Sequence, residues 1–142
     1  MKISIASGYF NPIHKGHIEY INSSREFGDY LIAIVNTDNQ VKLKGSVPFM
    51  DENHRMFVVK NLKCVDEVVL SIDKDRTVCE TLRMLKEKYS NDTLYFFNSG
   101  DRTSAMSESL EVKVCEQIGI NYKIIDLPKI CSSSELIKNS KL

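Results

Sequence analysis

Tryptophan is absent from the sequence of 142 residues, and neither sign of charge is in excess, since 19 Lys and Arg residues face 19 Asp and Glu residues. A formal net charge of zero excludes the long-range attraction that brings strongly basic proteins to nucleic acid or to an anionic membrane. We therefore expect no nucleic-acid partner. Any site for an anion must be built locally from a few residues.

Long apolar segments are missing as well. No run approaches the roughly 20 residues that cross a bilayer, and residues 1–6 are too short for a signal peptide. We expect a cytoplasmic protein with no membrane partner. The four cysteines lie far apart without a C-x-x-C pair, so the sequence predicts reduced thiols and no protein-bound metal site.

The chain length suits one domain with one hydrophobic core, spanning residues 1–142. Apolar runs of strand length alternate with amphipathic helical patterns. Strands are predicted at 3–6, 30–36, 65–72, 93–98 and 122–127, and helices at 16–27, 51–62, 77–88, between 103 and 118, and at 132–139. A polar loop is predicted at 37–48. This alternation predicts an α/β domain with a mainly parallel sheet.

Local signals also predict how individual helices begin and end. Asp51 is a predicted N-cap, and residues 77–80 have the form of a capping box. Gly28 and Gly119 follow predicted helices, and Gly28 stands where a residue with positive φ is wanted.

The loop after the first predicted strand carries the most specific chemistry. It spans residues 8–17, with the sequence GYFNPIHKGH, and it places His14 and His17 where the next helix begins. A helix start has unpaired N–H groups and the positive end of the helix dipole, so it attracts phosphate, and imidazole N–H groups add further donors. Gly8 and Gly16 let the backbone approach a ligand closely. The alternative is that the two histidines only cap the helix.

The pattern G-x-F-N-P-x-H-x-G-H resembles the signature of the HxGH nucleotidyltransferase superfamily, which includes glycerol-3-phosphate cytidylyltransferases, heptose-1-phosphate adenylyltransferases and nicotinamide mononucleotide adenylyltransferases. The resemblance implies a Rossmann-like fold, with an open, mainly parallel five-stranded sheet and helices on both faces. It also implies that His14 and His17 are catalytic and contact the triphosphate at its α-phosphate and at the bridge to the leaving group. The other positions of this loop that it implies as nucleotide-binding are Gly8, Tyr9, Phe10 and Gly16.

Two further segments match the superfamily in the first half of the chain. Residues 43–45 resemble the Leu-Lys-Gly of heptose-1-phosphate adenylyltransferases, which implies that Lys44 is catalytic, because a flexible ammonium can follow the phosphates. Lys42 is either a nucleotide contact or a solvated surface charge. Arg55 matches the helix-borne arginine of the family, and its planar guanidinium suits a phosphate or a structural carboxylate.

The carboxyl-terminal part resembles the second signature of the superfamily in the serine run at 132–134, whose hydroxyls and helix N–H groups hold the β- and γ-phosphates. Helix capping alone explains Ser132, and a plain turn is the alternative for Asp101 and Arg102. The nucleotide contacts implied in this part of the chain are Gly100, Asp101, Arg102, Lys129, Ser132, Ser133 and Ser134.

The resemblance implies transfer of a nucleoside monophosphate from CTP or ATP to the phosphate of a small phosphorylated sugar or polyol, of the glycerol-3-phosphate or heptose-1-phosphate type, with release of pyrophosphate. Mg²⁺ is expected to arrive with the triphosphate, bound mainly by phosphate and water. The segment before the serine run has Lys129 but no arginine, unlike glycerol-3-phosphate cytidylyltransferases, so the base stays open.

Two other functions remain open at this point. One is a nicotinamide or flavin mononucleotide adenylyltransferase, for which the absence of tryptophan leaves a stacking surface less evident. The other is a non-catalytic nucleotide-binding module. Superfamily members often form dimers, so a homodimer stays open as well.

Overall fold

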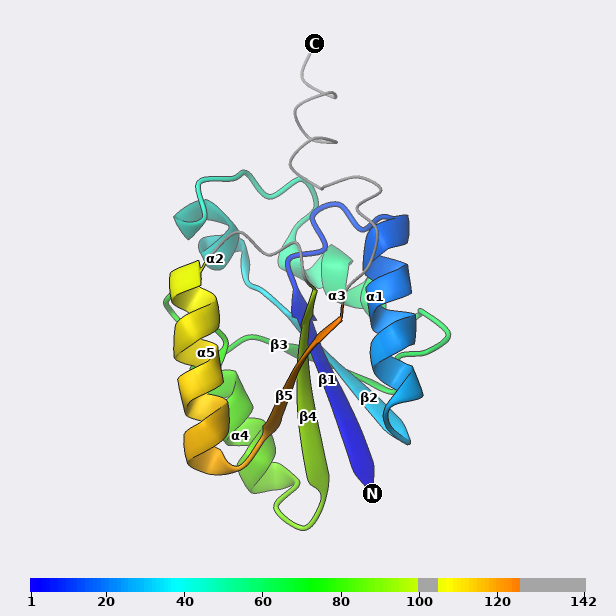
Figure 1. The fold of residues 1–142 in the computed structure, drawn as a ribbon. Coiled ribbons are helices and arrows are strands. Elements are labelled where there is room, and N and C mark those ends of the chain that lie inside the picture. The colour runs from blue at the N-terminus through cyan, green and yellow to red at the C-terminus, as the bar shows by residue number, and fades with distance from the viewer. Residues whose placement is uncertain (100–104, 126–142) are drawn as a thin grey trace.

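The computed structural model describes residues 1–99 and 105–125, in which strands and helices alternate as the apolar pattern predicts (Figure 1). The strands are β1 (Lys2–Gly8), β2 (Tyr30–Val35), β3 (Glu67–Leu70), β4 (Thr93–Ser99) and β5 (Asn121–Ile125). The helices are α1 (Lys15–Glu26), α2 (Asp38–Leu43), α3 (Glu52–Lys60), α4 (Cys79–Lys88) and α5 (Ala105–Ile118).

These strands form one open, parallel sheet in the order β3-β2-β1-β4-β5, which confirms the predicted fold class. β1 lies in the middle, where Ile5 pairs with Ile32 of β2 on one side and with Phe96 of β4 on the other. The chain builds outward from β1 to β3 and then returns to the other side of β1 with β4. This reversal makes the carboxyl ends of β1 and β4 a topological switch point, where open α/β sheets bind their ligands.

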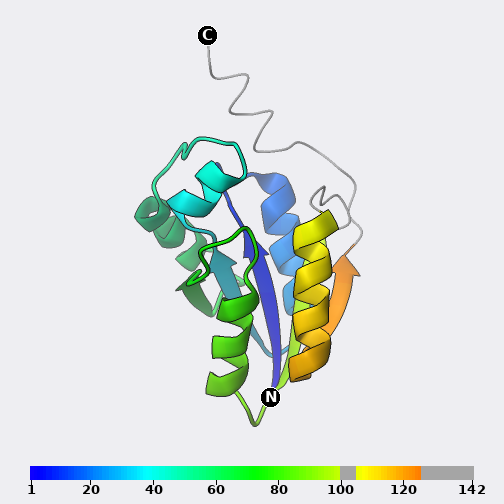
Figure 2. The ribbon, with the colours of Figure 1, turned by 90° about the vertical axis from the view of Figure 1, so that its left-hand side faces the viewer.

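Helices cover both faces of the sheet (Figures 1 and 2). Side chains alternate between the faces because a strand has a period of two residues. One face packs against α4 and α5 through a core that includes Ile5 and Leu82. The other face packs against α1 and α3 through Leu31, Ile21 and Val59. Burial on both faces explains why β2 is apolar along its length.

The connection after β2 differs from the sequence prediction. The prediction of a polar loop at 37–48 is wrong for the first half of this segment, because residues 38–43 form α2. The Thr37 hydroxyl accepts the Gln40 N–H at 3.1 Å, and the Gln40 side chain accepts the Thr37 N–H at 3.0 Å. This reciprocal pair is a capping box, and its T-x-x-Q pattern is visible in the sequence.

The start of α4 also differs from the prediction of a capping box at 77–80. Val78 occupies the N-cap and makes no cap hydrogen bond with its side chain. The buried Asp73 carboxylate instead accepts the backbone N–H groups of Glu80 at 2.7 Å and Thr81 at 2.9 Å. The cap therefore comes from the loop after β3, too far along the chain for the local pattern to show it.

Gly28 follows α1 as predicted, but its φ is not positive; among the described glycines, φ is positive at Gly45 and Gly119. A Cβ on Gly28 would lie 2.8 Å from both the Lys2 carbonyl oxygen and the Ser4 hydroxyl. Glycine is therefore required because the turn after α1 packs directly on β1. Gly119 ends α5 as the sequence predicts.

The amino end of the edge strand β3 carries a polar cluster. β3 spans 67–70 rather than the predicted 65–72, because these are the residues that pair with β2. The hydroxyls of Tyr30 and Tyr89 donate to Glu67 Oε1, and Lys88 Nζ lies 3.3 Å from Oε2. Burial raises the pKa of Glu67, but these hydrogen bonds outweigh burial and hold the pKa below its ordinary value.

Candidate active site

Residues 8–17, which we call the signature loop, connect β1 to α1 and begin its first turn, at the switch point of the sheet (Figure 1). His14 is the N-cap of α1, and its Nδ1 accepts the Gly16 N–H at 3.0 Å. The Nδ1 of His17 accepts the His14 N–H at 3.1 Å. Two imidazoles thus form a reciprocal capping box, a motif more often made by a hydroxyl and a Glu or Gln side chain.

Capping uses one nitrogen of each ring and determines the tautomer. Because Nδ1 accepts a hydrogen bond in both histidines, the proton of each neutral ring lies on Nε2. The two rings stack with centroids 3.9 Å apart and 26° between their planes. Protonation at Nδ1 would break the cap hydrogen bonds, so the arrangement favours two neutral Nε2–H donors of fixed direction. Capping a helix and binding a ligand are therefore compatible roles for His14 and His17.

The first turn of α1 favours an anion. It contains Lys15 and no acidic residue. The helix dipole adds partial positive charge at the same place, and the backbone N–H groups of His14 and Gly16 are already used in the capping box. The electrostatics of this turn therefore suit a phosphate group.

Two glycines of the signature loop make room for aromatic rings of the protein. A Cβ on Gly8 would lie 2.8 Å from the Phe10 ring, and a Cβ on Gly16 would lie 2.9 Å from Cε1 of His14. Phe10 has a φ of 50°, is fully buried and meets the His17 ring edge-on at 5.1 Å. The Phe10 side chain therefore packs inside the protein, and a nucleotide contact by Phe10 stays a prediction. The Phe10 ring packs against the His17 ring. Gly8 leaves room for the Phe10 ring and Gly16 for the His14 ring, so both glycines help to position the histidines.

Helix α2 places Lys44 beside the signature loop. Lys44 is the C-cap residue of α2, and its Nζ lies 4.3 Å from the centroid of the Tyr9 ring. Two residues predicted to act on the nucleotide, from separate segments of the chain, therefore meet. Lys42 is exposed on the same helix.

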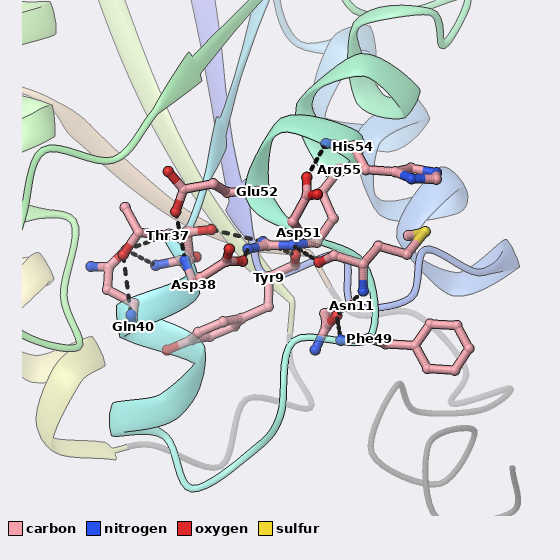
Figure 3. A network of polar contacts seen from close by, with 12 residues as sticks. Tyr9, Asn11, Thr37, Asp38, Gln40, Phe49, Asp51, Glu52, His54 and Arg55 are labelled. Carbon is pink, nitrogen blue, oxygen red and sulfur yellow. Dashed lines mark hydrogen bonds and ion pairs between the residues drawn. The ribbon is translucent and has the colours of Figure 1, made fainter.

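The Arg55 side chain is fully buried, and its guanidinium is used in contacts within the protein. Its Nη1 donates to the carbonyl oxygens of Tyr9 and Asn36, each at 2.7 Å, and its Nε donates to that of Met50 at 3.0 Å. Its Nη2 pairs with Asp38 at 2.7 Å (Figure 3). The structural alternative is therefore the one observed, and one guanidinium joins the signature loop, β2, α2 and the start of α3.

Asn11 has a structural role that the sequence interpretation missed. Its side-chain amide donates to the Val47 carbonyl oxygen at 2.8 Å and accepts the Phe49 and Met50 N–H groups at 2.6 and 3.2 Å. Asn11 therefore fastens the segment before α3 to the signature loop (Figure 3). The signal was available, because Asn11 belongs to the signature pattern itself.

Residues 5–139 match the cytidylyltransferase-like family, which is almost the whole chain. The chain belongs to the cytidylyltransferase-like family. The FAD synthase of Thermoplasma acidophilum is 34% identical to it over 127 residues, which are 88% of this chain and 81% of that protein. The FAD synthase of Picrophilus torridus is 31% identical over 146 residues, covering 96% and 93% of the two chains.

A solved structure is similar in fold and sequence. The crystal structure of a lipopolysaccharide core biosynthesis protein from Thermoplasma volcanium has a TM-score of 0.66 and 27% sequence identity, and the match covers 92% of this chain and 98% of that one. The family match and the similarity to these enzymes show that this cytidylyltransferase-like protein is a nucleotidyltransferase.

The remaining predicted site residues of this cytidylyltransferase-like enzyme lie outside the described residues. They are Gly100, Asp101, Arg102, Lys129, Ser132, Ser133 and Ser134. Within the described ranges, no group of three or more His, Cys, Asp or Glu side chains is placed to hold a metal ion. No helix in those ranges is long and apolar enough to cross a membrane.

Proposed function

We propose that this enzyme transfers AMP from ATP to the phosphate of FMN, forming FAD and releasing pyrophosphate. Its similarity to two FAD synthases over most of both chains favours the flavin alternative over the phosphorylated sugar that the sequence pattern placed first. The structural observation that carries the proposal is the pair of stacked imidazoles at the start of α1, because two fixed donors at a helix N-terminus suit a reacting phosphate.

The reaction needs no nucleophile from the protein. A phosphate oxygen of FMN attacks the α-phosphorus of ATP, and the bond from this phosphorus to the bridging oxygen of pyrophosphate breaks. Negative charge grows on the leaving group and on the oxygens of the transferred phosphate. The Nε2–H groups of His14 and His17 and the ammonium of Lys44 stabilise this charge, each by on the order of 3 kcal/mol.

Mg²⁺ fits this site as a companion of the triphosphate. It prefers phosphate oxygens and water and keeps much of its hydration, so it needs no cage of carboxylates. The donors proposed for phosphate at the start of α1 are the imidazole Nε2–H groups, because the backbone N–H groups of His14 and Gly16 already donate to the imidazole Nδ1 atoms. Bound Mg²⁺ neutralises charge on the phosphates, and Ser132, Ser133, Ser134, Arg102 and Lys129 remain proposed contacts for the triphosphate.

The flavin ring needs an apolar surface, and the segment between α2 and α3 offers one without tryptophan. Val47 and Phe49 are 56% and 52% exposed there, and Leu43, the last residue of α2, is 53% exposed. The Asn11 side chain holds this segment against the signature loop. Exposed apolar side chains on a segment whose backbone is hydrogen-bonded to the signature loop support a substrate that carries both a phosphate and a large aromatic ring.

A phosphorylated sugar is the second candidate acceptor. It is favoured by the similarity to the Thermoplasma volcanium protein, whose description concerns lipopolysaccharide core biosynthesis. This acceptor would use the same two histidines, since the attacking group is again a phosphate.

The experiment incubates the purified protein with ATP or CTP, Mg²⁺ and one acceptor, and it follows pyrophosphate and, by chromatography, the nucleotide product. FAD formed from ATP and FMN supports the proposal. If pyrophosphate is released only with sugar or polyol phosphates, the acceptor is the second candidate and not FMN. No pyrophosphate with any pair would contradict the proposal and favour a nucleotide-binding module.

A further inference from the structure

The contact between Tyr9 and Lys44 joins two segments that nucleotidyl transfer needs in one place. Tyr9 lies between the end of β1 and the histidines, whereas Lys44 follows α2. The Lys44 ammonium is 4.3 Å from the centroid of the Tyr9 ring, within the range at which a cation is attracted to an aromatic face. We propose that Tyr9 is the positioning residue for Lys44, and that its ring holds the ammonium where the triphosphate binds. This inference rests on the role of Lys44 in the proposed function.

Both partners of this contact are attached to one frame of hydrogen bonds, and Figure 3 shows its residues Arg55, Asp38 and Gln40. The buried Arg55 guanidinium donates to the Tyr9 carbonyl oxygen and pairs with Asp38, the first residue of α2, each at 2.7 Å. Because the guanidinium is planar, it fixes the backbone of Tyr9 and the start of α2 relative to each other.

Gln40 fixes the body of α2. Its side-chain amide is fully buried and donates to the carbonyl oxygens of Asp75 and Thr77 at 2.7 and 2.9 Å. The Lys44 N–H in turn donates to the Gln40 carbonyl oxygen at 3.1 Å. The backbone at Lys44 is therefore already in place, so a contact with the Lys44 ammonium acts on the rotamer freedom of its side chain.

The Tyr9 ring reduces this freedom. A lysine side chain loses rotamer entropy when its ammonium is ordered on a phosphate. An ammonium that already lies over the ring has lost part of that entropy before ATP arrives. An ammonium has three N–H donors, so it can contact a ring face and phosphate oxygens together. A contact at this exposure corresponds to about two- to fivefold in a binding constant.

The test measures ATP–Mg²⁺ binding by isothermal titration calorimetry without any acceptor. Tyr9→Leu removes the ring and keeps an apolar side chain, whereas Tyr9→Phe keeps the ring face and removes only the hydroxyl. We expect Tyr9→Leu to weaken ATP binding about two- to fivefold and Tyr9→Phe to bind like the wild type. With Lys44→Met, which must itself weaken ATP binding, the further change Tyr9→Leu should have no effect, because the ring then has no cation to hold.

Thermal unfolding of each variant checks that the fold is retained, and Tyr9→Met replaces Tyr9→Leu if the latter unfolds. Equal losses for Tyr9→Leu and Tyr9→Phe would assign the effect to the hydroxyl and overturn the proposal. The same loss from Tyr9→Leu with and without Lys44 would mean that the ring itself contacts the nucleotide, which also overturns it. Unchanged or tighter binding by Tyr9→Leu, or wild-type binding by Lys44→Met, would overturn it as well. Failure to form FAD would contradict the proposed acceptor. The ATP-binding results could still be interpreted, because they are measured without an acceptor.

Discussion

The stacked histidines allow a prediction that separates helix capping from catalysis. His14 Nδ1 accepts the Gly16 N–H at 3.0 Å, so deleting the ring removes a helix cap together with the Nε2–H donor. Serine is among the preferred N-cap residues. His14→Ser therefore keeps a cap and removes the imidazole, whereas His14→Ala removes both.

The two losses differ in size. Losing an N-cap costs about 1 kcal/mol in the free energy of unfolding, which lowers Tm by about 3 °C for a chain of this length. Losing one donor to the reacting phosphate costs about 3 kcal/mol of transition-state stabilisation, or roughly 100-fold in kcat. We expect both variants to lose kcat by this factor, and His14→Ala alone to lose Tm.

The assay measures kcat at saturating ATP and acceptor by pyrophosphate release, and Tm by circular dichroism. Asp51→Ala is the matched control, because Asp51 caps α3 by accepting the His54 N–H at 2.8 Å and donates nothing to a phosphate. It should lower Tm and keep kcat. Wild-type kcat in His14→Ser would refute the reasoning, since the imidazole would then be a cap and nothing more.

Three further perturbations follow from the described contacts. Arg55→Met leaves Asp38 and buried carbonyl groups without their guanidinium partner, so it should lower the free energy of unfolding, measured in urea, by about 3–5 kcal/mol. A loss below about 1 kcal/mol would contradict the structural role of the guanidinium. The lowered pKa of Glu67 stabilises the fold above the ordinary carboxyl pKa, and this stabilisation is lost as pH falls through the lowered value. Glu67→Gln should therefore make the free energy of unfolding less dependent on acid pH. An unchanged acid-unfolding profile would contradict this prediction. Phe49→Ala should raise the KM for FMN several-fold and leave the KM for ATP unchanged. The control Phe57→Ala, at a 70% exposed site on α3, should change neither KM. Equal effects of the two substitutions would contradict a flavin surface at Phe49.

Interactions between neighbours in the sequence were predictable. The strands β1, β2 and β4 are apolar runs, and the cap of α3 by Asp51 involves a residue three positions away. Helix α2 belongs to the same class, since Thr37 and Gln40 show its start in the sequence, although the polar composition of the segment concealed it. Local patterns carry the information where donor and acceptor lie within one helical turn, although α2 was missed and the capping box predicted at 77–80 did not form.

In the candidate site, too, the sequence located some features and did not show others. The pattern at 8–17 located the turn that we propose to be reactive, but it did not show that Phe10 packs against His17 or that Gly16 makes room for the ring of His14. Those facts depend on how the loop folds back over the carboxyl end of β1. A side chain named by a motif can serve the ligand or the neighbouring side chains, and burial decides between these roles.

By itself, the sequence determined the order of strands and helices and the meeting of two imidazoles at a helix start, because hydrophobic period and capping partners are encoded within a few residues. The tertiary structure alone decided that Arg55 serves the fold and that Lys44 lies over Tyr9. Arg55 finds its partners Asp38 and Tyr9 at distances of 17 and 46 residues along the chain. Which donor meets which acceptor at such separations depends on how β1, β2 and α3 pack together, and no local pattern carries that information.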